Sequence, residues 1–569
     1  MSPTLHYCHH WLARGVIMQP FFSFLNSSFS LAIITFHSEA KTKTFEDIGL
    51  KPSIANAVLE AFPDITHPTE AQSSFIPAIL NKKDVLLKDK TGSGKTFGVI
   101  LALLCKARQN ASARDQRRGF KPNITSILIT PHRDLAYQCE HWVKEIFDRI
   151  AQPEEDISSA VQVIVRNTST PLKSQVEKLN STPPHLVIGT PQALLEVYKE
   201  DPEALQLNKL SAVVVDEVDY LIETSPKPGR GFEHAKLKYD RKLKKHPSPT
   251  RQLLNAIYHR SNKLSGINEQ AQVGIRRPQL ILSSATLRAQ FRRSLMVEND
   301  WLTQSEGMLV KVTGSETLEG SQDNITHCAI VVSEDGSMKN VPWAEEASVD
   351  AIPAAEEDAT QETDSKASSQ VEESSATDSV DLTPDIEEIM EGAEDYSGIP
   401  SPFNPVALEA VAATFAVDVP LVALLVLPAS APVRRAVYDL RHLGVNAVGL
   451  DVAKENAGGA YMMRKDGKFD ETNPTLLVST LVSTRGMDLP QLSHVFVLGP
   501  PEDRSADTYL HIAGRVGRFG RGGKVVSILE EKREVRLANG KDGFKDEPLW
   551  MKRIYDRVGV KVKKVEHFE

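Results

Sequence analysis

The sequence predicts an α/β protein with two doubly wound parallel-sheet domains, the second interrupted by an acidic insert. Short runs of β-branched and other apolar residues alternate with helical stretches in two separate regions, from about residue 45 to 293 and from about 327 to 499. The chain has 569 residues, of which 41% are hydrophobic and 25% charged. This length allows about two to four domains. The composition excludes collagen-like, wholly disordered and disulfide-framework proteins.

The individual elements follow from the runs. In the first region, the runs at residues 124–130, 185–190, 210–217 and 280–286 are typical of strands buried on both faces. Helical stretches such as Thr96–Arg108 and Leu135–Ile150 separate them. The second region has strand-like runs at 327–333, 421–430, 475–480 and 494–499. We therefore place the first domain at 41–305, the second at 306–545 and a short C-terminal tail at 546–569.

The net charge of −9 hides an uneven distribution. Read as an average, it argues against a nucleic-acid partner. However, residues 344–395 hold 18 acidic residues and one lysine, so the remainder of the chain carries +8. Because this stretch is highly charged and poor in aromatic residues, we predict a disordered insert at about 342–401. It would either compete with nucleic acid for a basic face or take no part in binding.

The N-terminal segment and the cysteines bear on the compartment. Residues 1–38 contain no Asp or Glu and several Ser. Polar residues interrupt the apolar run at 21–34, which argues against a membrane span. A secretory signal needs a basic start and a small-residue cleavage site, and the start here has only His9, His10 and Arg14. Residues 1–40 are therefore either a mitochondrial transit peptide or an unstructured extension. The four cysteines lie far apart without a CxxC pair, which disfavours a zinc site and favours a reducing compartment.

A glycine-rich loop follows an apolar run at residues 85–87 and precedes a helix. Backbone N–H groups at a helix N-terminus form an anion site, and glycines let the backbone approach phosphate oxygens. In this setting a lysine can reach the β- and γ-phosphates, and a hydroxyl can hold Mg²⁺. The candidate phosphate-binding residues are Thr91, Gly92, Ser93, Gly94, Lys95 and Thr96.

A second acidic motif, DEVD at 216–219, ends a buried strand. Ligands of open α/β sheets bind at the carboxyl ends of the strands, where Asp216 would lie. An acid at this place can hold Mg²⁺, and Glu217 is placed to activate an attacking water. Asp216 and Glu217, with Lys95, are therefore candidate catalytic residues, and Thr96 and Asp216 candidate metal ligands.

Further elements occur in order along the chain: PTEAQ (68–72), TPHRDLA (130–136), TPQAL (190–194), SAT (284–286), STLVSTRGMD (479–488) and HIAGRVGRFGR (511–521). Together with TGSGKT and DEVD, this ordered set resembles the DEAD-box RNA helicases of superfamily 2 over about residues 45–530. The resemblance implies two tandem RecA-like domains, ATP and Mg²⁺ as cofactors, RNA as partner and a monomer. Membrane association is not implied.

The resemblance assigns roles in nucleotide binding. It implies that Phe45 stacks on adenine and that Gln72 hydrogen-bonds the adenine edge with help from Thr69. A purine other than adenine would leave the Gln72 amide badly paired. Asp488 would contact the ribose.

It also assigns roles that depend on both domains. Arg515 and Arg518 would reach the γ-phosphate as arginine fingers and stabilise charge in the transition state. Ser284, Thr286 and His511 would couple the ATP site to RNA. The two arginines would act only when the two domains close.

RNA would cross both domains and be held through phosphates and 2′-hydroxyls. Arg133, Thr190 and Thr480 match the positions with that role. Such contacts select RNA over DNA without reading a sequence. The activity implied is local strand separation, so a DNA helicase of the same superfamily is disfavoured.

The chain departs from the family pattern at several positions. Asp89 replaces a small residue of the phosphate loop and would weaken ATP binding if it pointed inward. Ala193 and Ile512 replace arginines, and Leu481 replaces an aspartate. These losses fall on RNA-contact and coupling positions, so an ATP-gated RNA clamp or assembly scaffold stays open as an alternative to a helicase.

A long insert separates DEVD from SAT. It spans residues 220–283, and residues 225–260 hold ten Lys and Arg against two acidic residues. The part at about 225–275 would add sequence-independent RNA affinity, or it would be a solvated charged loop.

The inserts, the short tail and the N-terminus resemble those of a fungal mitochondrial member of the family that acts in assembly of the large ribosomal subunit. This finer resemblance implies structured rRNA as substrate, ribosomal assembly proteins as partners and a location in the mitochondrial matrix. A nuclear or cytoplasmic location stays open.

Overall fold

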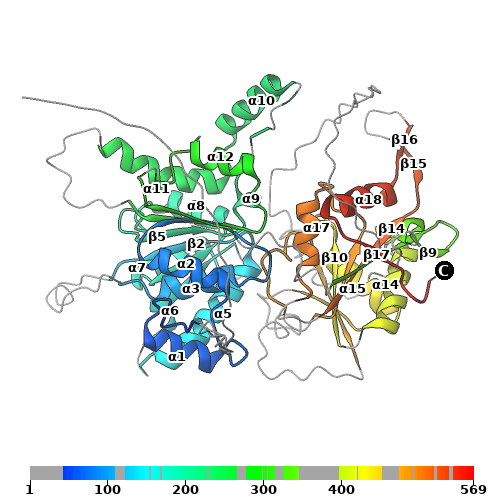
Figure 1. Ribbon diagram of the computed structural model, residues 1–569, viewed down its shortest axis with the longest axis horizontal. Coiled ribbons are helices and arrows are strands. Elements are labelled where there is room, and N and C mark those ends of the chain that lie inside the picture. Colours follow the sequence, from blue (N-terminus) through cyan, green and yellow to red (C-terminus); the bar gives the residue numbers. More distant parts are fainter. Residues whose placement is uncertain are drawn as a thin grey trace, which may run out of the picture. The chain divides into compact units, whose positions relative to one another are not determined.

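The computed structural model describes residues 43–568 apart from gaps at 109–121, 153–154, 167–169, 224, 227–228, 230, 266–276, 298, 304, 314–324, 345–395, 397, 420, 451–472, 490–491, 518–521 and 537–541. The described chain contains two large β-sheets, each accompanied by helices (Figure 1). The expected pair of α/β domains is confirmed. The predicted transit peptide and nearly all of the predicted acidic insert lie outside the described residues. Among the described helices, none has the length and apolarity needed to cross a membrane.

The first sheet has seven parallel strands in the order β3-β4-β2-β5-β6-β1-β7. The strands are β1 (Asp84–Lys88), β2 (Ser126–Ile129), β3 (Val161–Ile164), β4 (Leu186–Gly189), β5 (Ala212–Val215), β6 (Gln279–Ser284) and β7 (Leu309–Thr313). The central strands are apolar on both faces because helices cover both. Along β1, for example, Val85 and Leu87 join one apolar cluster, whereas Leu86 joins the other.

The helices of the first domain are α1 (Pro52–Ala61), α2 (Glu70–Leu80), α3 (Lys95–Leu104), α5 (Arg133–Ile150), α6 (Ile157–Ala160), α7 (Leu172–Ser181), α8 (Pro191–Glu200), α9 (Val218–Leu221), α10 (Phe232–Lys245), α11 (Pro249–Ser265) and α12 (Ala289–Val297). Helices α1, α2, α3 and α5 contribute to one apolar cluster, and α7, α8, α11 and α12 to the other. Helix α10 contributes no buried residue to either.

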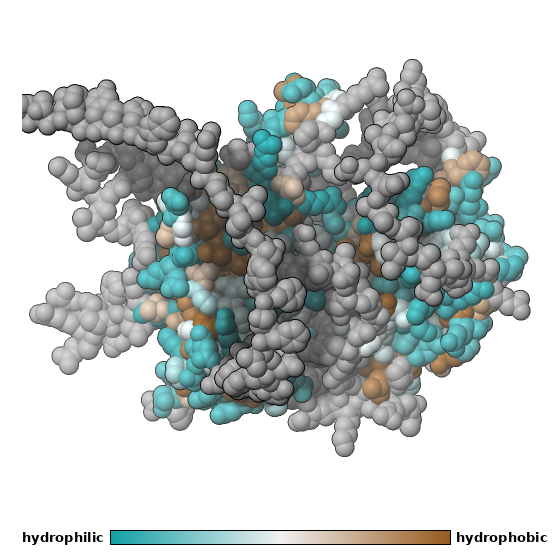
Figure 2. All heavy atoms as spheres, viewed as in Figure 1, coloured by the Kyte–Doolittle hydropathy of each residue, from teal (hydrophilic) through white to brown (hydrophobic). Residues whose placement is uncertain are grey.

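The second sheet is built on β11-β12-β10-β13-β14-β8-β17, all parallel, with β9 added antiparallel to β8. Its strands are β8 (Ile325–Val332), β9 (Met338–Asn340), β10 (Val422–Leu427), β11 (Ala447–Gly449), β12 (Thr475–Thr480), β13 (His494–Leu498), β14 (Gly523–Glu530) and β17 (Val562–Lys563). The helices are η1 (Pro342–Ala344), α14 (Pro405–Asp418), α15 (Val433–His442), α17 (Ala506–Ala513) and α18 (Glu547–Val558), and β15 (Arg533–Arg536) pairs with β16 (Asp542–Lys545). Hydrophilic residues dominate the visible surface of the described chain, with hydrophobic patches between them (Figure 2).

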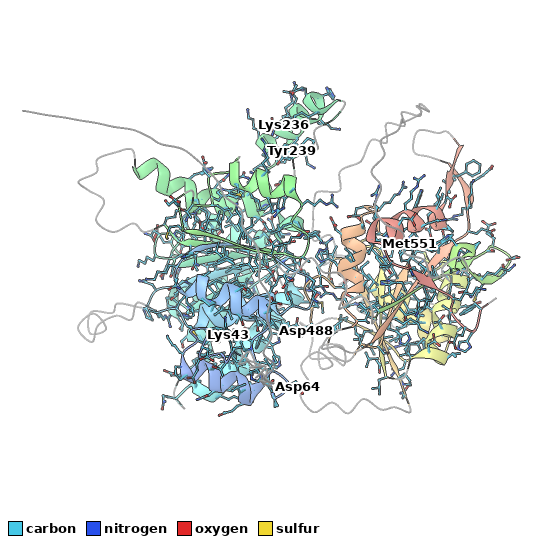
Figure 3. The ribbon with its side chains drawn as sticks, viewed as in Figure 1. Lys43, Asp64, Lys236, Tyr239, Asp488 and Met551 are labelled. Carbon is cyan, nitrogen blue, oxygen red and sulfur yellow. The ribbon has the colours of Figure 1, made fainter. Side chains whose placement is uncertain are left out.

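Two expected domain limits were wrong. The first domain continues past residue 305, because β7 pairs with β1 in the first sheet. The segment 546–569 is part of the second domain, because β17 pairs with β8. In addition, α18 buries Met551, Ile554 and Tyr555 on one face, in the spacing of an amphipathic helix (Figure 3). The C-terminal segment therefore completes the second core instead of forming a tail.

Candidate functional site

The glycine-rich loop connects β1 to α3, as predicted. Gly92 and Gly94 adopt left-handed backbone conformations with φ of 81° and 77°. A side chain at Gly94 would be strained by this φ and would lie 2.5 Å from the Gln72 amide nitrogen. Glycine is therefore required where the loop turns into α3. The first N–H groups of this ten-residue helix form a site suited to phosphate oxygens.

Lys95 lies buried at the start of α3. Its ammonium donates to the backbone carbonyls of Asp89 and Lys90 at 2.7 and 2.6 Å. Burial lowers the pKa of Lys95, and the carboxylates of Glu217, Asp216 and Asp89 partly offset this effect. The carboxylate of Asp89, which departs from the family pattern, accepts the N–H of the next residue, Lys90, at 2.8 Å.

The segment before α2 braces the loop from the other side. Thr69 caps α2 in a reciprocal capping box with Gln72. The Thr69 hydroxyl donates to the Ser93 carbonyl at 2.9 Å, and the Gln72 amide donates to the Gly94 carbonyl at 3.0 Å. Thr69 and Gln72 are thus close to the phosphate loop, and the structure uses the Gln72 amide to hold that loop.

The expected stacking of Phe45 on adenine would need an exposed aromatic ring, but the ring of Phe45 is buried. Phe45 is 2% exposed and packs in the core of the first domain. Its carbonyl accepts the N–H of Leu50 and closes a turn. The resemblance located this residue in the chain but could not tell that its ring is buried. Phe45 is therefore a core residue in this structure.

Asp216 follows β5 and faces the loop. Its carboxylate accepts the Thr96 hydroxyl at 2.6 Å and the Ser283 hydroxyl. Burial and the charge of Glu217 raise the pKa of Asp216, and the two hydroxyls oppose that rise. The two expected metal ligands, Thr96 and Asp216, thus lie in direct contact. Ser283 was missed, although a serine directly before SAT at a strand end was a usable signal.

Glu217 is strained and buried. Its φ of 49° is left-handed, which costs a non-glycine residue about 1–2 kcal/mol. One carboxylate oxygen, Oε2, has no hydrogen-bond partner among the described residues, although the side chain is only 6% exposed. Buried polar atoms are rarely left unpaired, so this oxygen is placed for a water or ligand atom.

Asp219 ties the acidic motif to SAT. Its two oxygens accept the hydroxyls of Ser284 and Thr286, both at 2.5 Å. Burial alone would raise the pKa of Asp219, but the nearby His511 and the hydrogen bonds from these hydroxyls outweigh it and lower the pKa. His511 Nε2 lies 3.8 Å from Asp219 Oδ2, and His511 Nδ1 lies 3.8 Å from Glu217 Oε2. Of the expected coupling residues, Ser284 and Thr286 therefore contact Asp219, and His511 lies close to both Asp219 and Glu217.

The expected arginine finger Arg515 is 1% exposed and held by its own domain. Its Nε donates to the His511 carbonyl at 3.0 Å, and its Nη1 donates to the Met487 carbonyl. Its charge nevertheless acts on Lys95 and lowers the pKa of that lysine. Arg518 lies outside the described residues.

Asp488 is held by a residue that sequence reasoning missed. The Gln138 side-chain amide donates to the Asp488 carbonyl and accepts its N–H, both at 2.9 Å. His132 makes a second contact of this kind, from its Nε2 to the Arg485 carbonyl at 2.5 Å. Gln138 lies in α5 and His132 caps that helix, so both contacts link α5 to the segment that follows β12. Only folding brings these segments together, so no local pattern revealed them.

The three expected RNA contacts lie at or just beyond the carboxyl ends of strands. Arg133 begins α5 with its side chain 44% exposed. Thr190 caps α8 after β4, and Thr480 ends β12; both are half-buried. Parallel sheets bind ligands at this edge, which agrees with the expected roles without testing them.

The departures from the family pattern are packing residues. Ala193 is 1% exposed and Ile512 is 2% exposed, each within an apolar cluster. Leu481 is half-buried and packs against the second core. The polar contacts expected of the family at these places have been replaced by apolar packing.

Two family models match the chain: DEAD/DEAH box helicase over residues 69–295 and helicase conserved C-terminal domain over residues 464–520. Among curated proteins, the chain is similar to "ATP-dependent RNA helicase DBP9" of Pyricularia oryzae (34% identity; 32% of this chain, 26% of the relative), to "Probable ATP-dependent RNA helicase DDX28" of Homo sapiens (29%; 32% and 31%) and to "DEAD-box ATP-dependent RNA helicase CshB" of Bacillus subtilis (32%; 32% and 37%). The matched segment thus spans about a quarter to somewhat more than a third of these relatives.

Two solved structures share the fold. One is Mss116p bound to ssRNA and AMP-PNP, with a TM-score of 0.56 and 20% identity over 93% of this chain and 80% of that one. The other is S. cerevisiae Dbp5 bound to RNA and ADP BeF3, with a TM-score of 0.53 and 15% identity over 92% and 95%. These likenesses confirm two tandem RecA-like domains.

Proposed function

We propose that this chain, which matches the DEAD/DEAH box helicase model over residues 69–295 and the helicase conserved C-terminal domain over residues 464–520, is an ATP-dependent RNA helicase that locally unwinds or remodels structured RNA. The observation that carries the proposal is the continuous set of contacts around the acidic motif. Asp216 accepts from Thr96 of the phosphate loop, and Asp219 accepts from Ser284 and Thr286. One four-residue motif thereby touches the nucleotide side and the coupling side.

ATP binds at the phosphate loop in this proposal. The N–H groups that begin α3 receive the phosphate oxygens, and Lys95 exchanges its two carbonyl contacts for the β- and γ-phosphates. Such an exchange costs little because the ammonium is already desolvated and held at the loop. Relatives in solved structures are described as bound to AMP-PNP or ADP BeF3, which supports ATP as the nucleotide.

Thr96 and Asp216 fit a magnesium ion. They offer a hydroxyl and a carboxylate oxygen 2.6 Å apart, and oxygen is the ligand atom that Mg²⁺ prefers. Burial raises the pKa of Asp216, and a bound cation would oppose this by favouring the ionised carboxylate. When bound, Mg²⁺ would neutralise charge on the phosphates.

Glu217 is the residue that would orient and deprotonate the attacking water. Its Oε2 is buried without a hydrogen-bond partner among the described residues, and His511 Nδ1 lies 3.8 Å from it. Arg515 would stabilise charge that develops on the γ-phosphate, together with Arg518. For this role Arg515 must release its carbonyl contacts and turn toward the nucleotide.

RNA is the proposed polymer substrate, held by Arg133, Thr190 and Thr480. Their exposed or half-buried positions at strand ends support backbone contacts without base readout. We further propose that the chain acts as a monomer, on rRNA, with assembly proteins as partners, in the mitochondrial matrix. Import of a fusion of residues 1–40 to a reporter, and sequencing of RNA crosslinked in cells, test the location and the substrate.

An ATP-gated clamp is the second candidate. The apolar packing of Ala193, Ile512 and Leu481 favours it, because these positions lack the polar groups expected for coupling closure to strand separation. Displacement of a short RNA strand from a duplex separates the two functions. The helicase proposal expects ATP-dependent displacement, whereas tight ATP-dependent RNA binding without displacement would favour the clamp.

A further inference from the structure

Helix α10 is an arm that stands out from the first domain. It belongs to the insert between the acidic motif and β6, and none of its residues is buried. It lies at the outer edge of the domain, beyond α12 (Figure 1). Lys236 and Tyr239 mark this helix in Figure 3. A helix without a buried face is not explained by packing in the core.

The arm carries four cations on one face. Lys238, Arg241, Lys242 and Lys245 follow the spacing i, i+3, i+4, i+7, so they form one stripe along the helix. All four are exposed. Within the part of the chain that the structure describes, none of them has an ion pair or side-chain hydrogen bond. We call these four residues the basic stripe.

The acidic residues of α10 lie away from the stripe. Asp240 lies beside Lys236, with 3.9 Å between its Oδ1 and the Lys236 ammonium. Glu233 falls on the same side by helical periodicity. Like charges three and four residues apart destabilise a helix by about 0.2–0.5 kcal/mol per pair. The stripe is therefore a set of uncompensated repulsions that a polyanion would relieve.

The opposite side of α10 faces its support. Phe232, Tyr239 and Leu243 are half-buried. The Tyr239 hydroxyl donates to the Glu223 carbonyl at 3.1 Å. An amphipathic membrane helix needs a continuous exposed apolar face, and Leu237, 55% exposed, is the only large apolar side chain of α10 that is exposed. The arrangement thus favours a polyanion in water over a membrane surface.

Glu223 fixes the base of the arm. Its carboxylate accepts the N–H and hydroxyl of Ser248 at 2.8 and 3.0 Å and lies 3.4 Å from Nε of Arg251. Arg251 belongs to α11, which packs against α8, the helix capped by Thr190. These contacts at its base restrict the orientation of the arm relative to α11, which packs against the helix that begins after Thr190. A fixed orientation reduces the entropy lost on binding.

We propose that the basic stripe is an auxiliary binding surface for the phosphate backbone of RNA, outside the segment held at Arg133 and Thr190. This inference rests on the proposed RNA-directed function. The stripe extends about 10 Å, since seven residues rise about 1.5 Å each, which suits a run of successive phosphates. Lys and Arg without polar side chains for base edges recognise backbone and not sequence. The partner is therefore the structured RNA that flanks the site of strand separation.

The test uses the full-length chain with Lys238, Arg241, Lys242 and Lys245 all replaced by Gln. Fluorescence anisotropy measures its affinity for a single-stranded RNA of about ten nucleotides and for the same RNA extended by a hairpin, at about 50 and 200 mM salt. For the extended RNA, the slope of log K against log salt should become less steep by about 3, because each lost phosphate contact removes about 0.7–0.9. Affinity for the short RNA should stay unchanged.

Two matched variants control for net charge and for folding. Replacing the exposed Lys82, Lys339, Lys561 and Lys563 by Gln removes the same charge elsewhere and should leave the slope unchanged. Replacing the three stripe lysines by Arg should retain the wild-type slope. Glutamine is a good helix former, so circular dichroism of the Gln variant should match the wild type.

The outcomes separate this inference from the proposed function. Equal slopes for the wild type and the stripe variant on the extended RNA would overturn the stripe while leaving the RNA function intact. An equal loss in the charge-matched control would overturn it as well. Unchanged RNA affinity with lost binding of polyglutamate would assign the stripe to an acidic protein instead. A wild type that binds neither RNA, with no RNA-stimulated ATP hydrolysis, would reject the proposed function itself.

Discussion

The link between the acidic motif and SAT is tested by replacing Asp219 with Asn. The carboxylate accepts the hydroxyls of Ser284 and Thr286, both at 2.5 Å. An amide of the same shape keeps one acceptor oxygen, but its NH₂ group then faces the second hydroxyl. The variant therefore loses one charged hydrogen bond and weakens the other.

The size of the effect follows from these contacts. A hydrogen bond to a charged group contributes about 1.5–3 kcal/mol. A loss of that size corresponds to a fall of about ten- to 150-fold in a rate, at about 1.4 kcal/mol per factor of ten. The loss should appear in RNA-stimulated ATP hydrolysis and not in ATP affinity, because the side-chain hydrogen bonds of Asp219 go to Ser284 and Thr286 and not to the phosphate loop.

The assay is steady-state ATP hydrolysis with saturating RNA, in a cycle with the double variant Ser284→Ala/Thr286→Ala. The two sets of changes remove the same contacts, so the combined variant should be little worse than either one. Full additivity, or an Asp219→Asn rate within about twofold of the wild type, would refute the coupling role.

Three further predictions concern packing and titration. Gly98→Ala places a methyl group 2.7 Å from the Phe75 ring, so thermal unfolding should reveal a loss of about 1–3 kcal/mol; an unchanged melting temperature would show that the neighbours yield. Burial lowers the pKa of His327 to about 4, so the unfolded chain binds more protons between pH 6.5 and about 4 and stability should fall as pH drops through that window. Denaturant titrations should show this fall, reduced in His327→Gln; a slope equal to that of the wild type would contradict it. Restoring the family arginine with Ala193→Arg should destabilise the chain by several kcal/mol, because the position is 1% exposed and lies within an apolar cluster; improved unwinding with unchanged stability would contradict this.

The sequence predicted the parts of the site that are contiguous in the chain. The phosphate loop and DEVD each carry their chemistry within a few residues, so their strand, turn and helix context could be recognised locally. Thr96 and Asp216 were expected as metal ligands from the same reasoning, and the structure brings them into hydrogen-bonding contact.

What was missed depends on contacts between distant segments. Ser283 reaches Asp216 only because β5 and β6 are neighbours, with Val215 beside Leu282. Gln138 reaches the Asp488 backbone across 350 positions of sequence. A resemblance gives the place of such a residue in the chain but not its burial, which is why Phe45 was assigned to adenine and found in the core.

The predicted limits of the domains were wrong for a related reason. The edge strand β7 has only one buried residue, Val312, so its pattern is weak. The strand β17 has only two residues and is recognised as a strand because it pairs with β8. Short edge strands are defined by the partner strand more than by their own composition.

ATP hydrolysis by the wild type and by Glu217→Gln, with and without RNA, tests the central claim most directly. The substitution keeps the shape of a side chain whose Oε2 is unpaired and buried beside Asp216, but it removes the base. The account predicts RNA-stimulated hydrolysis in the wild type and loss of hydrolysis in the variant, with ATP binding retained. Hydrolysis at the wild-type rate in Glu217→Gln, or a wild-type rate that RNA does not change, would contradict it.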